Sequence, residues 1–269
     1  MRAQQLATEF DERRIGTATW PIGERLHAWH VVAPLGRGGT AEAWLARAPD
    51  GREAALKLAR PELRAHPAAN AAIRREHEVL RRVASPHVVA SYDLLEWAGA
   101  AVLVLQYLPH GDLVSLAGAP PRSWLRAYAG AVAGLRALER QGLAHGDVKA
   151  RNVLFGADGN ARLIDLSHAR ALDAPAAAST AAHAPRPGAH ARAAEGDCFA
   201  LGVLLYELVT GRLPYGPEGA AAAGAEPQVA PLEDPEAERL LAAAVTALRA
   251  DGRGLGLSYF ADVIESVRA

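Results

Sequence analysis

The first part of the chain contains short apolar runs separated by turn residues, which is the pattern of β-strands. An apolar run from Trp29 to Leu35 leads into a glycine-rich stretch, and a second run follows it. Asp50-Gly51 separates this second run from a third, Ala54 to Leu58, and Asp-Gly between apolar runs is a strong hairpin signal. Runs at 88–96 and 101–107 are also typical of strands, and the latter is apolar on both faces, so it should be central or covered.

One stretch between these runs has helical spacing instead. From 67 to 84, Ile73, His77, Leu80 and Val83 recur every three or four residues, and a proline follows at position 86. Glu76 lies four residues before Leu80 and so shares its face, which predicts that the Glu76 carboxylate points inward. The alternatives are a solvated charged face, or Glu78 in this place if the helix has a different register.

Beyond residue 108 the spacing of apolar positions becomes helical. We predict helices over 122–141, 197–210, 235–249 and 258–267. The second is apolar nearly all round, so it should be buried, and Gly211 should end it. Asp234-Pro235 has the residue types of an N-cap and a first helical position. The stretch 174–194 is rich in alanine, proline and glycine and is predicted to be a surface loop.

Composition limits the class of protein. The chain has 269 residues, half of them hydrophobic, which suffices for one large domain or two packed lobes. A net charge of −1 gives no reason to expect nucleic acid or an anionic membrane as a partner. The single cysteine, Cys198, excludes an internal disulfide and favours a reducing compartment. No membrane span or signal peptide is apparent, so we expect a cytoplasmic protein, and the oligomeric state stays open.

The candidate chemistry lies around a predicted hairpin at 153–164, whose turn is Asp158-Gly159-Asn160. Asp147, Lys149 and Asn152 precede its first strand, and Asp165 follows its second. Phosphoryl transfer needs these groups: a carboxylate that orients the attacking hydroxyl, a cation, and an amide and a second carboxylate for Mg²⁺. The plainer interpretation is a charged hairpin at a sheet edge. Similarly, Lys57 is either a phosphate-binding ammonium or a snorkelling strand lysine.

These parts occur in an order that resembles the eukaryotic-like Ser/Thr protein kinases found in bacteria. The resemblance covers about residues 28–269 and implies an α+β, bilobal fold after a leader at 1–27. The N-lobe, 28–108, would be an antiparallel sheet with one helix, called helix C, and the C-lobe, 109–269, would be mainly helical. Nucleotide would bind between the two lobes.

The resemblance also assigns roles to individual residues. It implies ATP and Mg²⁺ as cofactors and an unidentified protein as the substrate. Asp147 would be the catalytic base, Lys149 would neutralise the γ-phosphate, and Asn152 and Asp165 would bind the metal. The residues that it assigns to ATP are Leu35, Gly36, Arg37, Gly38, Gly39, Ala43, Ala55, Lys57, Glu76, Gln106, Leu108 and Leu154. Asp197 and Gly202 match the opening of the family's buried helix.

The chain departs from the family pattern at several positions. Ala41 replaces the third loop glycine, and Gly146 replaces an arginine that often binds a phosphorylated activation loop. The D-F-G triplet is Asp165-Leu166-Ser167, whose serine restricts the backbone more than glycine. In the A-P-E triplet Arg186 replaces the glutamate. In the family that glutamate pairs with an arginine near the last helix, whose counterpart here could be Arg253, so we expect Arg186 to face a like charge. Because Gly146 offers no donor side chain, we expect activity that does not require phosphorylation of Ser179 or Thr180.

Three functions compete. The first is an active Ser/Thr protein kinase, which the intact polar set Lys57, Glu76, Asp147, Asn152 and Asp165 favours. The second is a pseudokinase acting as a nucleotide-binding or scaffolding module, which Leu166-Ser167 and Arg186 favour. The third is a small-molecule phosphotransferase of the aminoglycoside type, in which His-Gly-Asp also occurs. Lys149 and the helix predicted at 197–210 speak against the third.

Overall fold

A computed structural model of the chain describes residues 22–176, 180–186, 191–221, 226–227, 229 and 232–268. The predicted leader is described only from residue 22. The described residues divide into two compact units: the first contains residues 22–82 and Val89–Tyr107, and the second contains Val83–Val88 and the described residues from Leu108 onward. Val83–Val88 belongs to the second unit because Leu163 N donates to His87 O at 2.9 Å and Val88 forms a parallel bridge with Leu163.

The first unit is built on a six-stranded sheet in which every neighbouring pair is antiparallel, with the order β1-β2-β3-β4-β6-β5. Its strands are β1 (Arg25–Leu26), β2 (Trp29–Arg37), β3 (Ala41–Arg47), β4 (Glu53–Ala59), β5 (Ser91–Trp97) and β6 (Ala100–Gln106). All five predicted strands are confirmed, and β6, apolar on both faces, is internal as predicted. β1 pairs with β2, so the sheet begins before residue 28.

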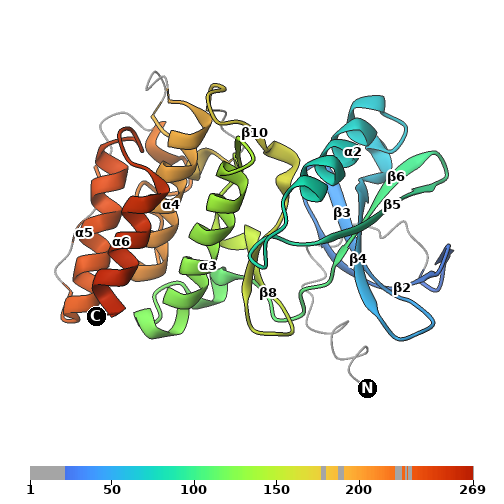
Figure 1. Cartoon of the computed structure of the whole chain (residues 1–269), viewed down its shortest axis with the longest axis horizontal. Coiled ribbons are helices and arrows are strands. Elements are labelled where there is room, and N and C mark those ends of the chain that lie inside the picture. The colour runs from blue at the N-terminus through green and yellow to red at the C-terminus, as the bar shows by residue number, and fades with distance from the viewer. Residues whose placement is uncertain are drawn as a thin grey trace. The chain divides into compact units, whose positions relative to one another are not determined.

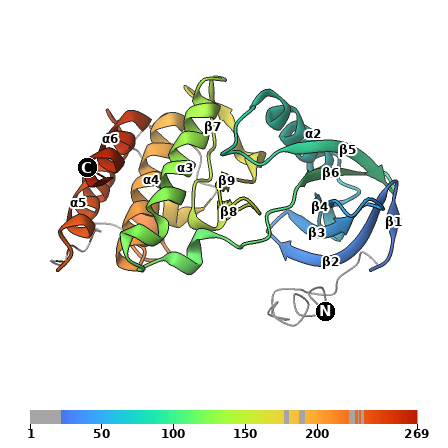
Figure 2. The same ribbon diagram turned by 60° about the horizontal axis from the view of Figure 1, so that its bottom comes forward.

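The two faces of this sheet are covered differently. One face carries an apolar cluster that includes Trp29, Trp44 and Leu56. Helix α2 (Pro67–Arg82) contacts β4, β5 and β6, and it lies along the sheet in both views (Figures 1 and 2). Strand residues alternate between the faces, so Lys57, next to Leu56 in sequence, points away from the cluster. The helix predicted at 67–84 is thereby confirmed.

The second unit is mainly helical (Figure 1). Its long helices are α3 (Pro121–Glu139), α4 (Ala193–Thr210), α5 (Pro235–Arg249) and α6 (Leu257–Arg268). α4 is buried almost throughout, as predicted, and ends at Gly211, which has φ 72°. It begins at Ala193 rather than Asp197, and at its start Glu195 Oε2 accepts from the backbone N of Arg192 at 2.8 Å. None of the helices in the described ranges could cross a membrane.

Two small antiparallel pairs complete the second unit and position its polar residues. The predicted hairpin is present as β8 (Val153–Phe155) and β9 (Ala161–Leu163). A second pair, β7 (Leu143–Ala144) with β10 (Arg170–Ala171), was not predicted, because a two-residue strand has no recognisable periodicity. The segment 145–152 therefore connects β7 to β8, and 164–169 connects β9 to β10. Each of the two segments is thus held at both ends by a paired strand.

Candidate active site

In the first unit the candidate site is an ion pair between Lys57 of β4 and Glu76 of α2. Lys57 Nζ lies 2.9 Å from Glu76 Oε1 and 2.6 Å from Oε2. The Glu76 side chain is fully buried, whereas Glu78 is exposed, so the predicted register is confirmed and the alternative with Glu78 is wrong. A buried carboxylate needs such a partner, because an unpaired charge is costly in the interior.

The other ATP residues predicted in the first unit lie on β2, β3, β4 and β6 or in the turn between β2 and β3. Ala43 is directly opposite Lys57 across β3 and β4, and Ala55 lies on the same face two residues earlier. The glycine-rich stretch turns where Gly38 N donates to Ala41 O at 2.8 Å, and a Cβ at Gly36 or Gly39 would meet no other atom within 4 Å. Backbone can therefore come close to a ligand there. The remaining members on these strands are Leu35, Arg37 and Gln106.

Arg37 differs from the rest of the glycine-rich stretch because its side chain is engaged. Its Nη2 lies 3.1 Å from a carboxylate oxygen of Glu62, which also pairs with Arg60. A contact between Arg37 and ATP would therefore come from the backbone. Leu108 and Leu154, the last two residues predicted to contact ATP, belong to the second unit. A nucleotide site shared by the two units remains a prediction.

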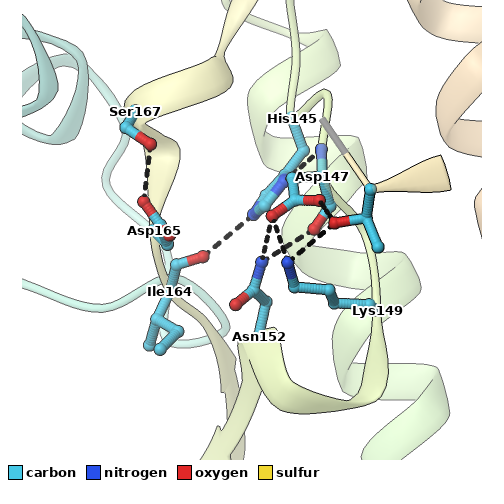
Figure 3. A network of polar contacts seen from close by, with 8 residues as sticks. His145, Asp147, Lys149, Asn152, Ile164, Asp165 and Ser167 are labelled. Carbon is cyan, nitrogen blue, oxygen red and sulfur yellow. Dashed lines mark hydrogen bonds and ion pairs between the residues drawn. The ribbon is translucent and has the colours of Figure 1, made fainter. Parts of the chain in front are cut away.

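In the second unit the polar residues converge on Asp147 (Figure 3). Lys149 Nζ donates to Asp147 Oδ2 at 2.7 Å. Asn152 Nδ2 donates to the same oxygen at 3.0 Å and to Asp147 O at 2.8 Å. Thr180 Oγ1 donates to Asp147 Oδ1 at 2.7 Å and accepts from Lys149 Nζ at 2.9 Å. The carboxylate is thus held by donors on both of its oxygens.

The backbone that carries Asp147 is fixed by α4 and by β9. Asp197 accepts from His145 N at 2.6 Å and from Gly146 N at 2.8 Å. Burial raises the pKa of the Asp197 carboxyl, and these two hydrogen bonds act against that shift. His145 accepts from Asp147 N through Nδ1, so its Nε2 carries the proton that it donates to Ile164 O at 3.0 Å. His145 therefore links the two segments that hold the candidate residues (Figure 3).

Asn152 and Asp165 fit the donor chemistry of Mg²⁺, which prefers oxygen ligands. Asn152 directs its amide nitrogen at Asp147, which leaves its side-chain oxygen as the available ligand atom. Ile164 N donates to Asn152 O at 3.0 Å, so the residue before Asp165 is tied to Asn152 across the β8–β9 hairpin. The described residues contain no cluster of three or more His, Cys, Asp or Glu that could hold a metal by themselves. Mg²⁺ usually keeps several waters and takes further oxygens from substrate phosphates, so two protein ligands are compatible with such a site.

Comparison with known proteins identifies the family. A family model described as "Protein kinase domain" matches residues 29–230. The chain belongs to the protein kinase family. The family and the α+β fold predicted from the sequence are confirmed, although α5 and α6 lie beyond the matched residues.

Curated relatives carry the names of protein kinases. CBL-interacting protein kinase 4 from Oryza sativa subsp. japonica is 33% identical over 199 residues, which cover 67% of this chain and 44% of that protein. The probable serine/threonine-protein kinase PkwA from Thermomonospora curvata is 33% identical over 204 residues, which cover 71% of this chain and 27% of that protein. Serine/threonine-protein kinase AfsK from Streptomyces coelicolor is 32% identical over 221 residues, which cover 77% of this chain and 26% of that protein. The chain thus spans less than half the length of each of these relatives.

Gly146, at the position of the kinase arginine, has a backbone that excludes a side chain. Its φ is 79°, and an added Cβ would lie 2.6 Å from His168 O. Arg170 lies beside it and donates from Nε to the same carbonyl at 3.0 Å. The predicted lack of a phosphate-binding side chain at 146 therefore follows from backbone geometry as well as from residue type.

The predicted like-charge contact of Arg186 is wrong, because an acidic residue was overlooked. Arg186 Nη1 lies 3.2 Å from Asp251 Oδ1, and Arg253 lies 3.8 Å from the other oxygen of the same carboxylate. Arg186 also packs over the Tyr215 ring, with 5.7 Å to its centroid. Asp251 is buried, and its carboxylate lies between the two arginines, so Arg186 faces an opposite charge.

Two residues of the loop at 180–186 were not predicted as parts of the site. Thr180 appeared only as a candidate phosphate acceptor, yet its hydroxyl contacts both Asp147 and Lys149, where a phosphate would repel the carboxylate. Ser179, the other candidate, lies outside the described residues. His183 lines a pocket with Asp147 and Thr180, and burial lowers its pKa to about 4, so it is neutral at pH 7. An alanine-rich loop has no periodicity that could have shown these positions.

The Thr180 contacts give the first prediction. Thr180→Ala removes a donor to Asp147 and an acceptor for Lys149, so we expect phosphotransfer to fall roughly a hundredfold, the scale that a misplaced catalytic group produces. Thr180→Ser keeps the hydroxyl and should retain most of the rate. Steady-state kinetics with generic protein acceptors measure both variants. A wild-type rate in Thr180→Ala would contradict the assigned contact.

The Arg186–Asp251 pair gives the second prediction. A double-mutant cycle with Arg186→Met and Asp251→Asn should show a coupling energy of about 1 kcal/mol or more, the range expected for contacting residues. Asparagine suits position 251 because it tolerates the left-handed backbone, which has φ 51° there. Denaturant unfolding gives the free energies. The exposed pair Arg74–Glu96, at 3.4 Å, is the control and should show no measurable coupling. Additive effects at Arg186 and Asp251 would refute the ion pair.

Proposed function

We propose that this chain is a Ser/Thr protein kinase that transfers the γ-phosphoryl group of ATP to serine or threonine hydroxyls of a protein substrate. The observation that carries the proposal is the hydrogen-bonded set around Asp147, which brings Lys149, Asn152 and Thr180 onto one buried carboxylate. Phosphoryl transfer depends mainly on positioning and on charge stabilisation, and this set provides both.

Asp147 would orient the attacking hydroxyl and accept its proton as the new P–O bond forms and the bond to the leaving ADP oxygen breaks. A carboxylate held by three side-chain donors keeps its orientation while an acceptor approaches. Lys149 lies close enough to Asp147 to place a cation beside the transferred group, where it would offset negative charge. Thr180, whose hydroxyl bonds to both, would hold the Asp147 and Lys149 side chains in position relative to each other.

The remaining predicted residues would bind nucleotide and metal. Lys57, fixed by Glu76, would contact the α- and β-phosphates, and Ala43 and Ala55 would pack against adenine. Asn152 and Asp165 would hold Mg²⁺, which when bound neutralises charge on the phosphates. The single cysteine still supports the predicted cytoplasmic setting.

The pseudokinase and the small-molecule phosphotransferase are the competing functions. Against a scaffold that binds no nucleotide stands the buried pairing of Lys57 with Glu76, which costs desolvation. Against a nucleotide-binding pseudokinase stands the set of donors on Asp147, which nucleotide binding alone does not require. Against a small-molecule enzyme stand the contact of Lys149 with Thr180 and the names of the relatives. A phosphotransfer assay with radiolabelled ATP, generic protein acceptors and small-molecule acceptors tests all three functions.

Asp147→Asn should separate catalysis from nucleotide binding. The amide keeps the shape of the side chain but cannot accept the proton, so we expect phosphotransfer to fall by about 10²- to 10⁴-fold. Mg·ATP should still raise the melting temperature, since binding to the folded state alone stabilises it. The exposed Asp262→Asn is the control. A wild-type protein that shows neither a thermal shift nor phosphotransfer would favour the scaffold function.

Lys57→Met should abolish most of the phosphotransfer, by roughly 10²-fold or more, because the phosphates lose their cation. It also removes the ammonium that pairs with the buried Glu76 carboxylate, which should cost about 3–5 kcal/mol of stability. The double change Lys57→Met with Glu76→Met removes both charges, so it should recover stability but not activity. Melting curves and kinetics on both variants measure these effects. Wild-type phosphotransfer in the stable double variant would contradict the phosphate-binding role.

A further inference from the structure

Ser167 makes a contact that the kinase pattern does not supply. Its Oγ donates to Asp165 Oδ1 at 2.7 Å (Figure 3). The family has glycine at this position, which has no side chain to donate. The chain therefore places an additional hydroxyl directly on the carboxylate that is predicted to bind metal.

We propose that Ser167 is a positioning residue for Asp165, which fixes the rotation of its carboxylate for Mg²⁺ binding. This inference rests on the proposed function, because it needs Asp165 as a metal ligand. Side chains that hydrogen-bond to a metal ligand orient that ligand, and their loss typically weakens metal binding.

The backbone around Asp165 explains why such a restraint has an effect. Asp165 has φ 61° and ψ 70°, in the left-handed region, which is unfavourable for an L-residue. Aspartate tolerates this region because its short side chain bonds locally, and here the local partner is the hydroxyl two residues ahead. One hydrogen bond thus stabilises an unfavourable backbone conformation and sets the direction of the carboxylate.

The hydroxyl itself is held in a fixed place. Ser167 lies in a 3-10 turn, Leu166–His168, in which Leu166 is fully buried and Ala169 N donates to Leu166 O at 3.0 Å. The turn is bounded by β9 on one side and β10 on the other, and each of these is paired with another strand. Because the donor sits on a hydrogen-bonded turn between two paired strands, it can preorganise the ligand before metal arrives.

The two predicted metal ligands share this design. Asn152 is oriented because its amide nitrogen donates to Asp147, and Asp165 is oriented because its Oδ1 accepts from Ser167. Each ligand thus has one side-chain atom restrained by a neighbour. Mg²⁺ demands near-ideal octahedral geometry, so the orientation of its few protein ligands affects its affinity.

The competing explanation is that Ser167 only stabilises the turn. In that case its loss would lower the melting temperature with and without metal, and the metal concentration needed for binding would not change. A positioning residue instead changes that concentration. The dependence on Mg²⁺ therefore separates the two roles and can be read without any catalytic turnover.

The experiment measures, for the full chain at saturating ATP, the Mg²⁺ concentration that gives half of the metal-dependent thermal shift. Ser167→Ala and Ser167→Gly should raise this concentration about 10- to 100-fold. Equal effects in both variants would assign the effect to the hydroxyl and not to backbone restriction. Ser167→Thr keeps a hydroxyl and should stay within about threefold of wild type, and so should the exposed control Ser266→Ala.

The Asp165→Asn background tests whether Ser167 acts through Asp165. This variant should have lost most of the metal-dependent shift already, and adding Ser167→Ala should not reduce it further. Two results would overturn the inference about Ser167 while leaving the proposed function standing. One is a wild-type Mg²⁺ midpoint in Ser167→Ala, and the other is that Ser167→Ala reduces the metal-dependent shift as much in the Asp165→Asn background as in wild type. A wild-type protein whose shift with ATP does not depend on Mg²⁺ would overturn the predicted metal site, and the role of Ser167 with it.

Discussion

The buried carboxylate of Asp197 is the interaction on which the second unit's site depends. It accepts two consecutive backbone N–H groups, those of His145 and Gly146, and so joins the start of α4 to the segment that carries Asp147. Two adjacent amides point at one carboxylate only if the backbone between them turns, and Gly146 allows this with its φ of 79°. A Cβ at position 146 would also collide with His168 O, so both the turn and the surrounding space require glycine.

Ion pairs restrain candidate site residues in both units. In the first unit Lys57 and Glu76 neutralise each other between a strand and a helix. In the second, Lys149 and Asp147 do the same within one loop, with Thr180 bonded to both. Such pairs contribute little net stability, because desolvation offsets their attraction. Their benefit is fixed geometry, which is what transfer of a phosphoryl group demands.

Much of the fold and part of the site could be predicted because local periodicity encodes them. The 3.6-residue spacing between 73 and 83 placed Glu76 on the inward face, and the turn at Asp158-Gly159-Asn160 placed Asn152 and Asp165 at neighbouring strand ends. What escaped prediction depends on long-range contacts. Asp251 is 65 positions from Arg186, and Thr180 lies in a loop whose alanines have no pattern. Likewise, Val83–Val88 joins the second unit because His87 bonds to the β9 strand.

Two departures from the kinase pattern share a property that bears on the choice between an enzyme and a scaffold. At Arg186 the reversed charge meets Asp251, and at Ser167 the added hydroxyl bonds to Asp165. Each of these two substitutions therefore has a matching partner, either far along the chain or two residues away. Substitutions accumulated without constraint have no physical reason to match in this way, because most single changes are destabilising. The matching favours a chain in which the geometry around Asp147 and Asp165 still serves phosphoryl transfer.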